Sequence, residues 1–221
     1  MTPAAIRINN KEYSLPHQLD FLDIGGGTGG SFALVKKRFK CERGLAIDIE
    51  KKKIDQAIAN GIPAIQLDAT NLNIFQDNAC RLVSMVHMLE HLPSKSLASS
   101  TLHECARVAS DFLFIRGPMF YLDYLASYGL KFYWSDWKGH TLMIEPGDIL
   151  AMIDRHLIDS FEVRYIKQVE SSSDTCIHPL EGKTDRHEYD ALIDPPKRMN
   201  IVFDRPIYKE FELTIKLSNI S

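Results

Sequence analysis

The sequence predicts an α/β fold, a doubly wound, mostly parallel and Rossmann-like sheet of seven strands. Three observations predict it: short apolar runs alternate with helical patterns from about residue 19, a glycine-rich turn follows the first apolar run, and two longer strand-like runs come late. Parallel neighbours need crossover connections, which are usually helices, so this alternation favours a sheet that is covered on both faces.

The five expected parallel strands are short apolar runs, and they cover residues 19–24, 44–49, 63–68, 81–87 and 111–116. Helices are expected over 31–39, 51–60 and 94–108. In the first of them Phe32, Val35 and Phe39 recur at helical spacing, and Ser94 can cap the third. Each helix therefore follows or precedes a strand, as the doubly wound class requires.

After residue 117 the alternation stops. The segment 117–140 is rich in aromatic residues, and a further helix is expected at roughly 146–156. The runs 161–169 and 207–217 predict two late strands, an antiparallel pair that closes the sheet. The polar stretch 170–206 between them is too long for a turn and predicts a small cap or insert.

Residues 1–221 are expected to form a single domain, because this length suits one core. Residues 1–18 form an N-terminal extension in which "RINNKEY" predicts a small hairpin about Asn9-Asn10.

The composition is that of a soluble globular protein, with 45% hydrophobic residues, 25% charged residues and a formal net charge of −3. This charge, and the lack of a basic patch with interleaved aromatic residues, argue against a nucleic-acid partner. No apolar run suits stable membrane insertion. Four scattered cysteines and the lack of a signal-peptide pattern predict a cytoplasmic location. The sequence does not predict an oligomeric state.

The glycine loop "FLDIGGGTGG" (21–30) indicates a ligand that approaches the backbone closely. The pattern Gly25-x-Gly27-x-x-Gly30 fits a dinucleotide site that binds pyrophosphate, which leaves an NAD(P)-dependent oxidoreductase as one reading. Asp23 favours a cationic ligand instead, because a carboxylate repels pyrophosphate and a buried charge needs a partner. A third reading is that Asp23 merely caps a backbone turn.

Together with "GLAIDIE" (44–50), "QLDATNL" (66–72) and "VSMVHMLEHLP" (83–93), the stretch "DIGGGTG" (23–29) resembles the motifs of class I S-adenosylmethionine (SAM)-dependent methyltransferases. The last stretch resembles the "LEH" segment after strand four of small-molecule members. The resemblance spans about residues 19–160. It implies SAM as cofactor and methyl transfer to an oxygen or nitrogen atom of a small molecule. A non-catalytic SAM-binding protein is the other alternative.

The resemblance also implies the residues of the cofactor site. Asp48 is expected to accept hydrogen bonds from the ribose hydroxyls, and Asp68 from the adenine amine, with the Ala69 N–H reaching a ring nitrogen. The complete expected set is Asp23, Gly25, Gly26, Gly27, Gly29, Asp48, Ile49, Asp68, Ala69 and His87.

Histidine is the natural base for a hydroxyl acceptor near neutral pH, and His140, His91 and His87 are the catalytic candidates. His140 follows strand five, where many small-molecule methyltransferases carry a histidine. An ordinary loop-fixing hydrogen bond is the alternative for His140, and a local pairing for His91. No metal site is expected, because the sequence shows no convincing carboxylate cluster and the histidines are dispersed.

The aromatic residues of 119–137 have two main interpretations: rings that cover the sheet edge, or a substrate lid. A membrane-surface contact is a third. If 119–128 is helical, Tyr121, Tyr124 and Tyr128 share one face.

Overall fold

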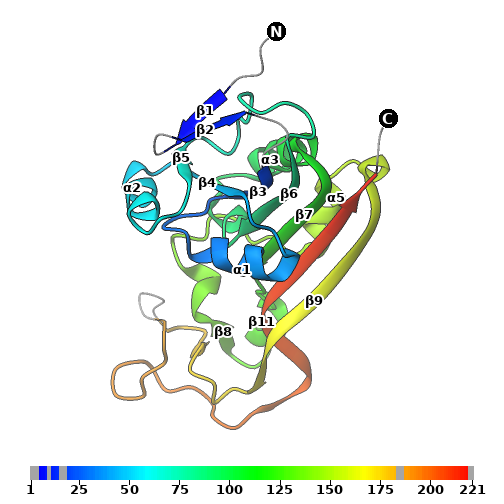
Figure 1. Cartoon of the computed structure of the whole chain (residues 1–221). Coiled ribbons are helices and arrows are strands. Elements are labelled where there is room, and N and C mark those ends of the chain that lie inside the picture. The colour runs from blue at the N-terminus through cyan, green and yellow to red at the C-terminus, as the bar shows by residue number, and fades with distance from the viewer. Residues whose placement is uncertain (1–4, 9–10, 15–18, 183–186, 219–221) are drawn as a thin grey trace.

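The computed structural model describes residues 5–8, 11–14, 19–182 and 187–218, and a seven-stranded sheet forms its centre (Figure 1). The strand order is β5-β4-β3-β6-β7-β11-β9. The strands from β5 to β7 are parallel, and β11 pairs antiparallel with both β7 and β9. The predicted Rossmann-like class, with its late antiparallel pair, is confirmed.

Each expected strand is present, and most strand ends lie within two residues of the expected ones; the strands are β3 (Leu19–Ile24), β4 (Gly44–Asp48), β5 (Ala64–Gln66), β6 (Cys80–Val86), β7 (Ala109–Pro118), β9 (Ile158–Ser171) and β11 (Val202–Leu217). The late pair is longer than expected at the insert side, because β9 and β11 continue past the sheet and stay paired to Ser171↔Val202. The insert between them is correspondingly shorter than 170–206.

The helices also follow the expected order; they are α1 (Gly30–Phe39), α2 (Lys51–Ala59), α3 (Lys95–Val108), α4 (Leu122–Ala126) and α5 (Pro146–Met152), with short 3-10 turns η1 (Leu89–His91), η2 (Tyr133–Asp136) and η3 (Arg155–Leu157). Ser94 caps α3 as predicted, since its hydroxyl accepts from the Leu97 N–H at 3.2 Å. The expected helix 146–156 ends earlier, because Ile153 turns to an extended backbone and is buried in the core.

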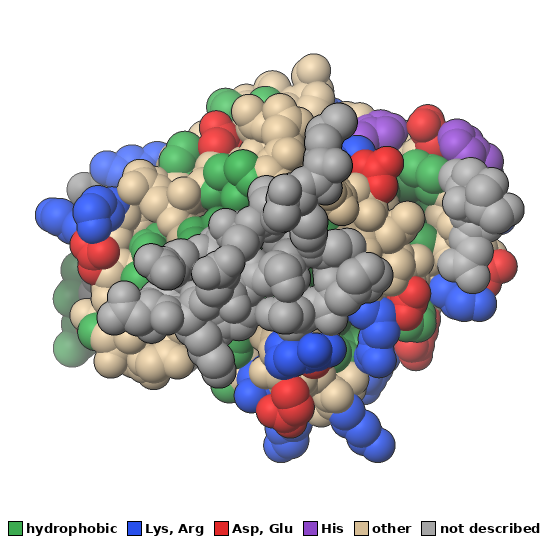
Figure 2. All heavy atoms as spheres, turned by 45° about the horizontal axis from the view of Figure 1, so that its top comes forward, with side chains coloured by type: hydrophobic (Ala, Val, Ile, Leu, Met, Phe, Trp, Pro, Cys, Tyr) green, Lys and Arg blue, Asp and Glu red, His purple; other side chains and the backbone are tan. Residues whose placement is uncertain are grey.

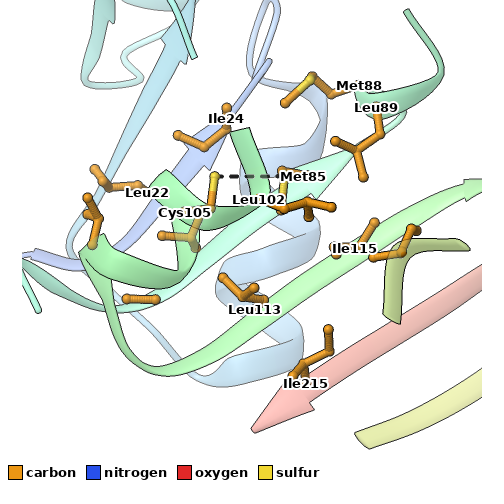
Figure 3. Packing of buried hydrophobic residues seen from close by; sticks show 14 of the residues in the cluster. Leu22, Ile24, Met85, Met88, Leu89, Leu102, Cys105, Leu113, Ile115 and Ile215 are labelled. Carbon is orange, nitrogen blue, oxygen red and sulfur yellow. Dashed lines mark hydrogen bonds between the residues drawn. The ribbon is translucent and has the colours of Figure 1, made fainter. Parts of the chain in front are cut away.

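The two sheet faces carry different helices because side chains alternate along each strand. On β3, Phe21 packs with α1 and α2, whereas the next residue, Leu22, faces the larger cluster that includes α3 and α5. Figure 3 shows Leu102 and Cys105 of α3 over the strand residues of this second face. Burial of each such side chain contributes about 1.5–3 kcal/mol.

A third cluster lies beyond the carboxyl ends of the parallel strands, where α4, β8 (Leu130–Phe132) and β10 (Ile177–Pro179) lie (Figure 1). We call it the aromatic lobe; its buried members are Phe120, Leu125, Leu130, Phe132, Trp134, Val169, Cys176, Ile177, Phe203 and Ile207. Strands β8 and β10 pair antiparallel. The lobe therefore joins the aromatic segment to the late insert in one apolar unit.

The conditional helix 119–128 does not form over its whole length, because only Leu122–Ala126 is helical. Tyr121 precedes it with a positive φ of 46°, and its ring lies 6.3 Å from that of Phe132. The rings of Tyr124 and Tyr128 do contact each other, at 5.4 Å. The three tyrosines therefore do not form one helical face.

The hairpin prediction for the N-terminal extension is confirmed for its strands, since β1 (Ala5–Ile8) pairs antiparallel with β2 (Lys11–Ser14). Asn9 and Asn10 lie outside the described residues. Among the described helices, none has the length and apolar character needed to cross a membrane. On the face in Figure 2, the Lys and Arg side chains drawn lie beside Asp and Glu side chains.

Candidate functional site

The glycine loop leaves the carboxyl end of β3 and leads directly into α1. Gly25 and Gly29 have φ values of +67° and +94°, which other residues rarely adopt. A Cβ on Gly25 would also stand 2.4 Å from Cγ of Met88. Backbone conformation and contact both require glycine here, so the loop brings its backbone close to the end of β6.

Asp23 lies under this loop and is fully buried. Its carboxylate accepts hydrogen bonds from the hydroxyl groups of Ser31 and Ser84. Burial raises the pKa of Asp23 to about 6, although the two hydroxyl groups oppose the rise. The two serine hydroxyls are therefore hydrogen-bond partners of this buried carboxylate. Direct contact between Asp23 and a cationic ligand stays a prediction.

Asp48 joins the glycine loop to the next strand. One carboxylate oxygen accepts from the Gly27 N–H at 3.0 Å and the other from the Glu50 N–H at 2.8 Å. A carboxylate has about four lone-pair sites, so Asp48 can still accept from a ligand. The side chain of Ile49, the next residue, is largely exposed.

Asp68 lies beyond β5 at the same edge of the sheet and is exposed. Its carboxylate accepts from the backbone N–H and the hydroxyl of Thr70, at 2.9 and 2.8 Å. Ala69 is half-buried beside it. A backbone hydrogen bond from Leu67 to the Asp48 carbonyl, at 3.1 Å, holds this strand end next to the previous one.

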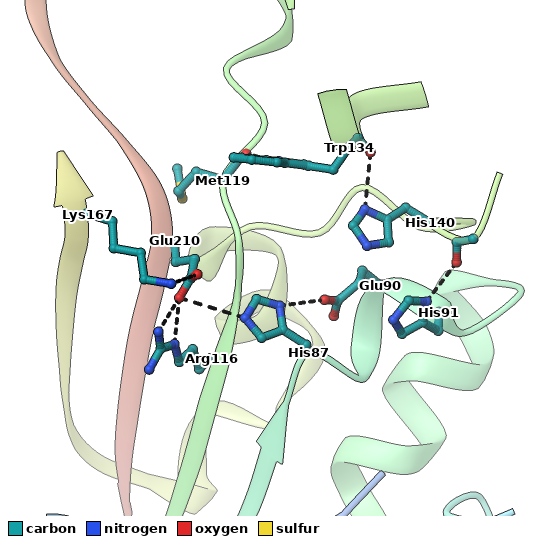
Figure 4. Close-up of polar contacts among 10 residues, drawn as sticks. His87, Glu90, His91, Arg116, Met119, Trp134, His140, Lys167 and Glu210 are labelled. Atoms are coloured by element: carbon teal, nitrogen blue, oxygen red, sulfur yellow. Dashed lines mark hydrogen bonds and ion pairs between the residues drawn. The ribbon is translucent and has the colours of Figure 1, made fainter. Parts of the chain in front are cut away.

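His87 lies at the end of β6 between two carboxylates, those of Glu90 and Glu210 (Figure 4). Burial lowers the pKa of His87, but these carboxylates outweigh burial and raise it to about 9. His87 also has a positive φ of 51°, a strained backbone that is often found at functional sites. A protonated imidazole donates hydrogen bonds, so His87 is poorly suited to act as a base at pH 7.

Glu210 connects His87 to two cations, Arg116 on β7 and Lys167 on β9. Burial raises the pKa of Glu210, but the hydrogen bonds from His87, Lys167 and Arg116 lower it to about 2. Sequence reasoning missed these three residues. The alternation in "IYKEFELTIKL" signals only a strand with one polar face, and the register of β11 against β7 and β9 places Glu210 here.

Two cavities, each of 490 Å³, meet at this charged group. The first, the loop cavity, is lined by Gly25, Gly26, Gly30 and Ser31 among others. The second, the histidine cavity, is lined by Glu90, His91 and His140 and by rings of the aromatic segment. Their linings share His87, Lys167 and Glu210.

His91 and His140 come together at the histidine cavity, with ring centroids 5.2 Å apart. Nδ1 of His91 lies 2.7 Å from the Gly139 carbonyl, and Nδ1 of His140 lies 3.1 Å from the Trp134 carbonyl. Burial lowers the pKa of His140, which favours its neutral form, although Glu90 opposes this shift. All three predicted catalytic histidines therefore border one cavity.

The aromatic segment divides between two environments. Phe120, Phe132 and Trp134 are buried in the aromatic lobe, where they cover the end of the sheet. Tyr133, Trp134 and Trp137 line the histidine cavity. Both expected uses of these rings therefore have counterparts in the structure, and the lid interpretation stays a prediction.

Residues 21–111 match a family model described as a methyltransferase domain. The matched part carries the glycine loop, Asp48 and Asp68, and it supports a methyltransferase that uses SAM as its cofactor. The glycine loop and Asp48 fit this cofactor, because the loop needs glycine beside Met88 and Asp48 offers oxygen acceptors at the adjacent strand end. No curated protein sequence matches this chain.

Solved structures of low sequence identity share the methyltransferase fold. A SAM-dependent methyltransferase from Archaeoglobus fulgidus is 16% identical, with a TM-score of 0.61, over 91% of this chain and 87% of that chain. The YcgJ protein from Bacillus subtilis is 13% identical, with a TM-score of 0.58, over 92% and 93%. A SAM-dependent methyltransferase from Methanosarcina mazei is 16% identical, with a TM-score of 0.53, over 89% and 91%.

Proposed function

We propose that this methyltransferase transfers the methyl group of SAM to an oxygen or nitrogen atom of a small molecule that binds in the histidine cavity. The observation that carries the proposal is the junction of the two cavities at His87, Lys167 and Glu210. A donor site and an acceptor site must adjoin for direct transfer. Holding the two reactants in place supplies much of the rate increase.

We assign the cofactor to the edge formed by the glycine loop, Asp48 and Asp68, with Asp23 beneath and Ile49, Ala69 and His87 beside it. When bound there, SAM supplies a methyl group on a positively charged sulfur. Protonated His87 is paired with Glu90 and Glu210, and it holds the border between the two cavities. The half-buried imidazole of His140 faces the acceptor side.

A small molecule suits the histidine cavity for two reasons. Its volume of 490 Å³ is in the range of small-ligand sites. Its lining combines aromatic rings with charged groups such as Lys209 and Glu188, which can orient a polar acceptor. We propose no nucleic-acid partner and no stable membrane insertion, in line with the net charge of −3, and we keep the cytoplasm as the proposed location.

Isothermal titration calorimetry with S-adenosylhomocysteine and, separately, NAD tests the donor assignment. We expect binding of the SAM product and not of NAD, and the opposite result would support the oxidoreductase alternative. A methyl-transfer screen over hydroxyl and amine acceptors then tests catalysis. Tight donor binding without transfer to any acceptor would support a non-catalytic SAM-binding protein.

His140→Ala tests the acceptor side. We expect turnover to fall at least about tenfold, because a positioned acid–base group contributes on this scale or more. The affinity for S-adenosylhomocysteine should stay nearly unchanged, since the described contacts of His140 lie away from the glycine loop. Undiminished turnover in the variant would remove His140 from the mechanism.

A further inference from the structure

The structure brings two imidazoles and one buried carboxylate together beside the histidine cavity. One ligand atom from each of Glu90, His91 and His140 lies within 4.8 Å of those of the other two. Two ligands that share an ion at about 2.1 Å stand about 3–4 Å apart, so small side-chain rotations close this set around one ion. No metal site was expected from the sequence, because the histidines are dispersed and His140 lies far along the chain from Glu90 and His91.

Hydrogen bonds to backbone carbonyls orient both imidazoles. A carbonyl oxygen only accepts, so Nδ1 of His91 donates to Gly139 and Nδ1 of His140 donates to Trp134. This tautomer leaves Nε2 of each ring with its lone pair available. Metal-binding histidines are usually held in this way, with the second ring nitrogen donating to a carbonyl or carboxylate.

The buried carboxylate supplies the negative charge. Glu90 is 1% exposed, and its Oε1 lies 3.1 Å from Nδ1 of His87. Figure 4 shows His87, Glu90, His91 and His140 gathered in one group. Protonated His87 offsets part of the cost of burying that charge, and a metal cation beside the carboxylate would offset more of it.

Backbone and side-chain hydrogen bonds also fix the two segments against each other. The Leu142 N–H donates to the Glu90 carbonyl at 3.0 Å, and the Thr141 hydroxyl donates to the Leu92 carbonyl at 2.8 Å. The loop that carries His140 is therefore held against η1, which carries Glu90 and His91. Such a scaffold keeps three ligands in place at little cost in conformational entropy.

We propose that Glu90, His91 and His140 bind one divalent transition-metal ion, and that the ion's open positions take an oxygen atom of a hydroxyl-bearing methyl acceptor. Two imidazoles favour a transition metal over magnesium or calcium. The three ligands all line the histidine cavity, so a bound acceptor can reach the ion. The acceptor role rests on the proposed function, whereas the metal site does not.

A coordinated hydroxyl group loses its proton more readily, because the cation stabilises the oxygen anion. The O–H bond breaks, its electron pair stays on oxygen, and the proton passes to water in the open cavity. His140 then acts as a ligand of the ion rather than as the base, because Nε2 binds the metal and Nδ1 donates to the Trp134 carbonyl. The proposed function allows methyl transfer to oxygen or nitrogen. With this metal site, the acceptor is an alcohol or a phenol.

Titration of the full-length, chelator-treated protein with CoCl₂ alone, followed by visible absorption, tests the site without SAM. We expect one Co²⁺ ion per chain with a spectrum that ZnCl₂ abolishes. Glu90→Gln, His91→Ala and His140→Ala should each weaken binding by more than the ~10–100-fold typical of outer-sphere changes. Acetohydroxamate, a simple oxygen ligand, should shift the Co²⁺ spectrum if coordination positions are open.

His103→Ala is the matched control. Nδ1 of His103 also bonds a carbonyl, that of Ser99 at 2.8 Å, and its Nε2 lies 3.5 Å from a carboxylate oxygen of Asp154. This variant should bind Co²⁺ like the wild type. Thermal melts in EDTA identify any variant that fails to fold, and exposed His91 offers a substitution that folding should tolerate.

Unchanged Co²⁺ affinity in folded His91→Ala and Glu90→Gln variants would overturn the proposal, as would the lack of any binding by the wild type. Calorimetry with S-adenosylhomocysteine in EDTA separates this result from failure of the proposed function. If that ligand binds and Co²⁺ does not, only the metal site is wrong. If Co²⁺ binds and that ligand does not, the donor assignment is wrong and the metal site stands.

Discussion

Asp23 shows how a single buried carboxylate can lower the stability of the folded protein. The carboxylate is fully buried, and two serine hydroxyls are its described partners. Its pKa of about 6 lies above the ordinary value of 3.8, so the folded state holds the proton more tightly than the unfolded chain does. Ionisation of Asp23 therefore weakens folding.

We predict that stability falls as the pH rises from about 4 to 6, by about 3 kcal/mol for this group, and stays lower above pH 6. Asp23→Asn should remove this part of the slope and raise the stability at pH 7. Urea denaturation across this range measures both effects. Asp55→Asn, which removes an exposed carboxylate on α2, is the control and should keep the wild-type slope. Equal slopes for wild type and Asp23→Asn would contradict the prediction.

His87 and Glu210 show why a residue's position in sequence does not define its role. The two side chains are 123 positions apart, yet their charges pair at the border of the two cavities. His87 was expected among possible bases, but the two nearby carboxylates keep it protonated. A neighbour supplied by a distant strand thus decides the protonation state of a residue that the sequence had identified.

At the scale of elements, the junction of β3 and α1 sets the shape of the glycine loop. Gly29 caps α1 with a φ of +94°, and a Cβ there would stand 1.9 Å from Cδ1 of Ile62. The next residue, Gly30, begins the helix, and a Cβ there would meet no atom within 4 Å. A side chain at Gly29 would therefore cause strain, whereas Gly30 leaves room for one.

Gly29→Ala should destabilise the protein by about 2–4 kcal/mol, through the left-handed backbone and the contact with Ile62. Gly30→Ala should be neutral or stabilising by up to about 1 kcal/mol, since alanine favours helices. Guanidinium denaturation measures each change. Ile62→Val removes Cδ1 and should partly rescue Gly29→Ala. A Gly29→Ala protein as stable as Gly30→Ala would show that the described loop geometry is wrong.

The whole molecule combines a sheet core, which carries the glycine loop, with an aromatic lobe that has its own apolar cluster. Phe132 is fully buried in the lobe and stacks on Trp134, with ring centroids 4.3 Å apart. Both tryptophans of the chain, Trp134 and Trp137, line the histidine cavity beside the aromatic lobe, so their fluorescence reports on that part. Far-UV circular dichroism reports mainly on the sheet and its helices.

Phe132→Ala should cost about 3–5 kcal/mol within the lobe. In urea, the fluorescence transition of this variant should then precede the circular dichroism transition, because the sheet keeps its own core. Phe21→Ala, which removes an equally buried ring on β3, is the matched control and should move both transitions together. Coincident transitions in Phe132→Ala would mean that lobe and sheet unfold as one unit.

The order of strands and helices, and the position of the glycine loop, could be predicted from the sequence because they depend on local patterns. Alternation and helical spacing act over a few residues, and the run "FLDIGGGTGG" contains both a strand and its turn. Asp48 was found in the same way, as a carboxylate at a strand end. The helix expected over 146–156 and the conditional helix 119–128 were too long, since tertiary packing fixes such ends.

Local pattern by itself determined the doubly wound fold, the glycine loop and the candidate histidines of this chain. Only the tertiary structure decided which distant residues meet: Glu210 with His87, and His140 with Glu90 and His91. The physical reason is that charge pairing and metal coordination depend on separation in space. That separation follows from the register of the long β11 strand and from the loop held against η1, and neither leaves a periodic signal in the sequence.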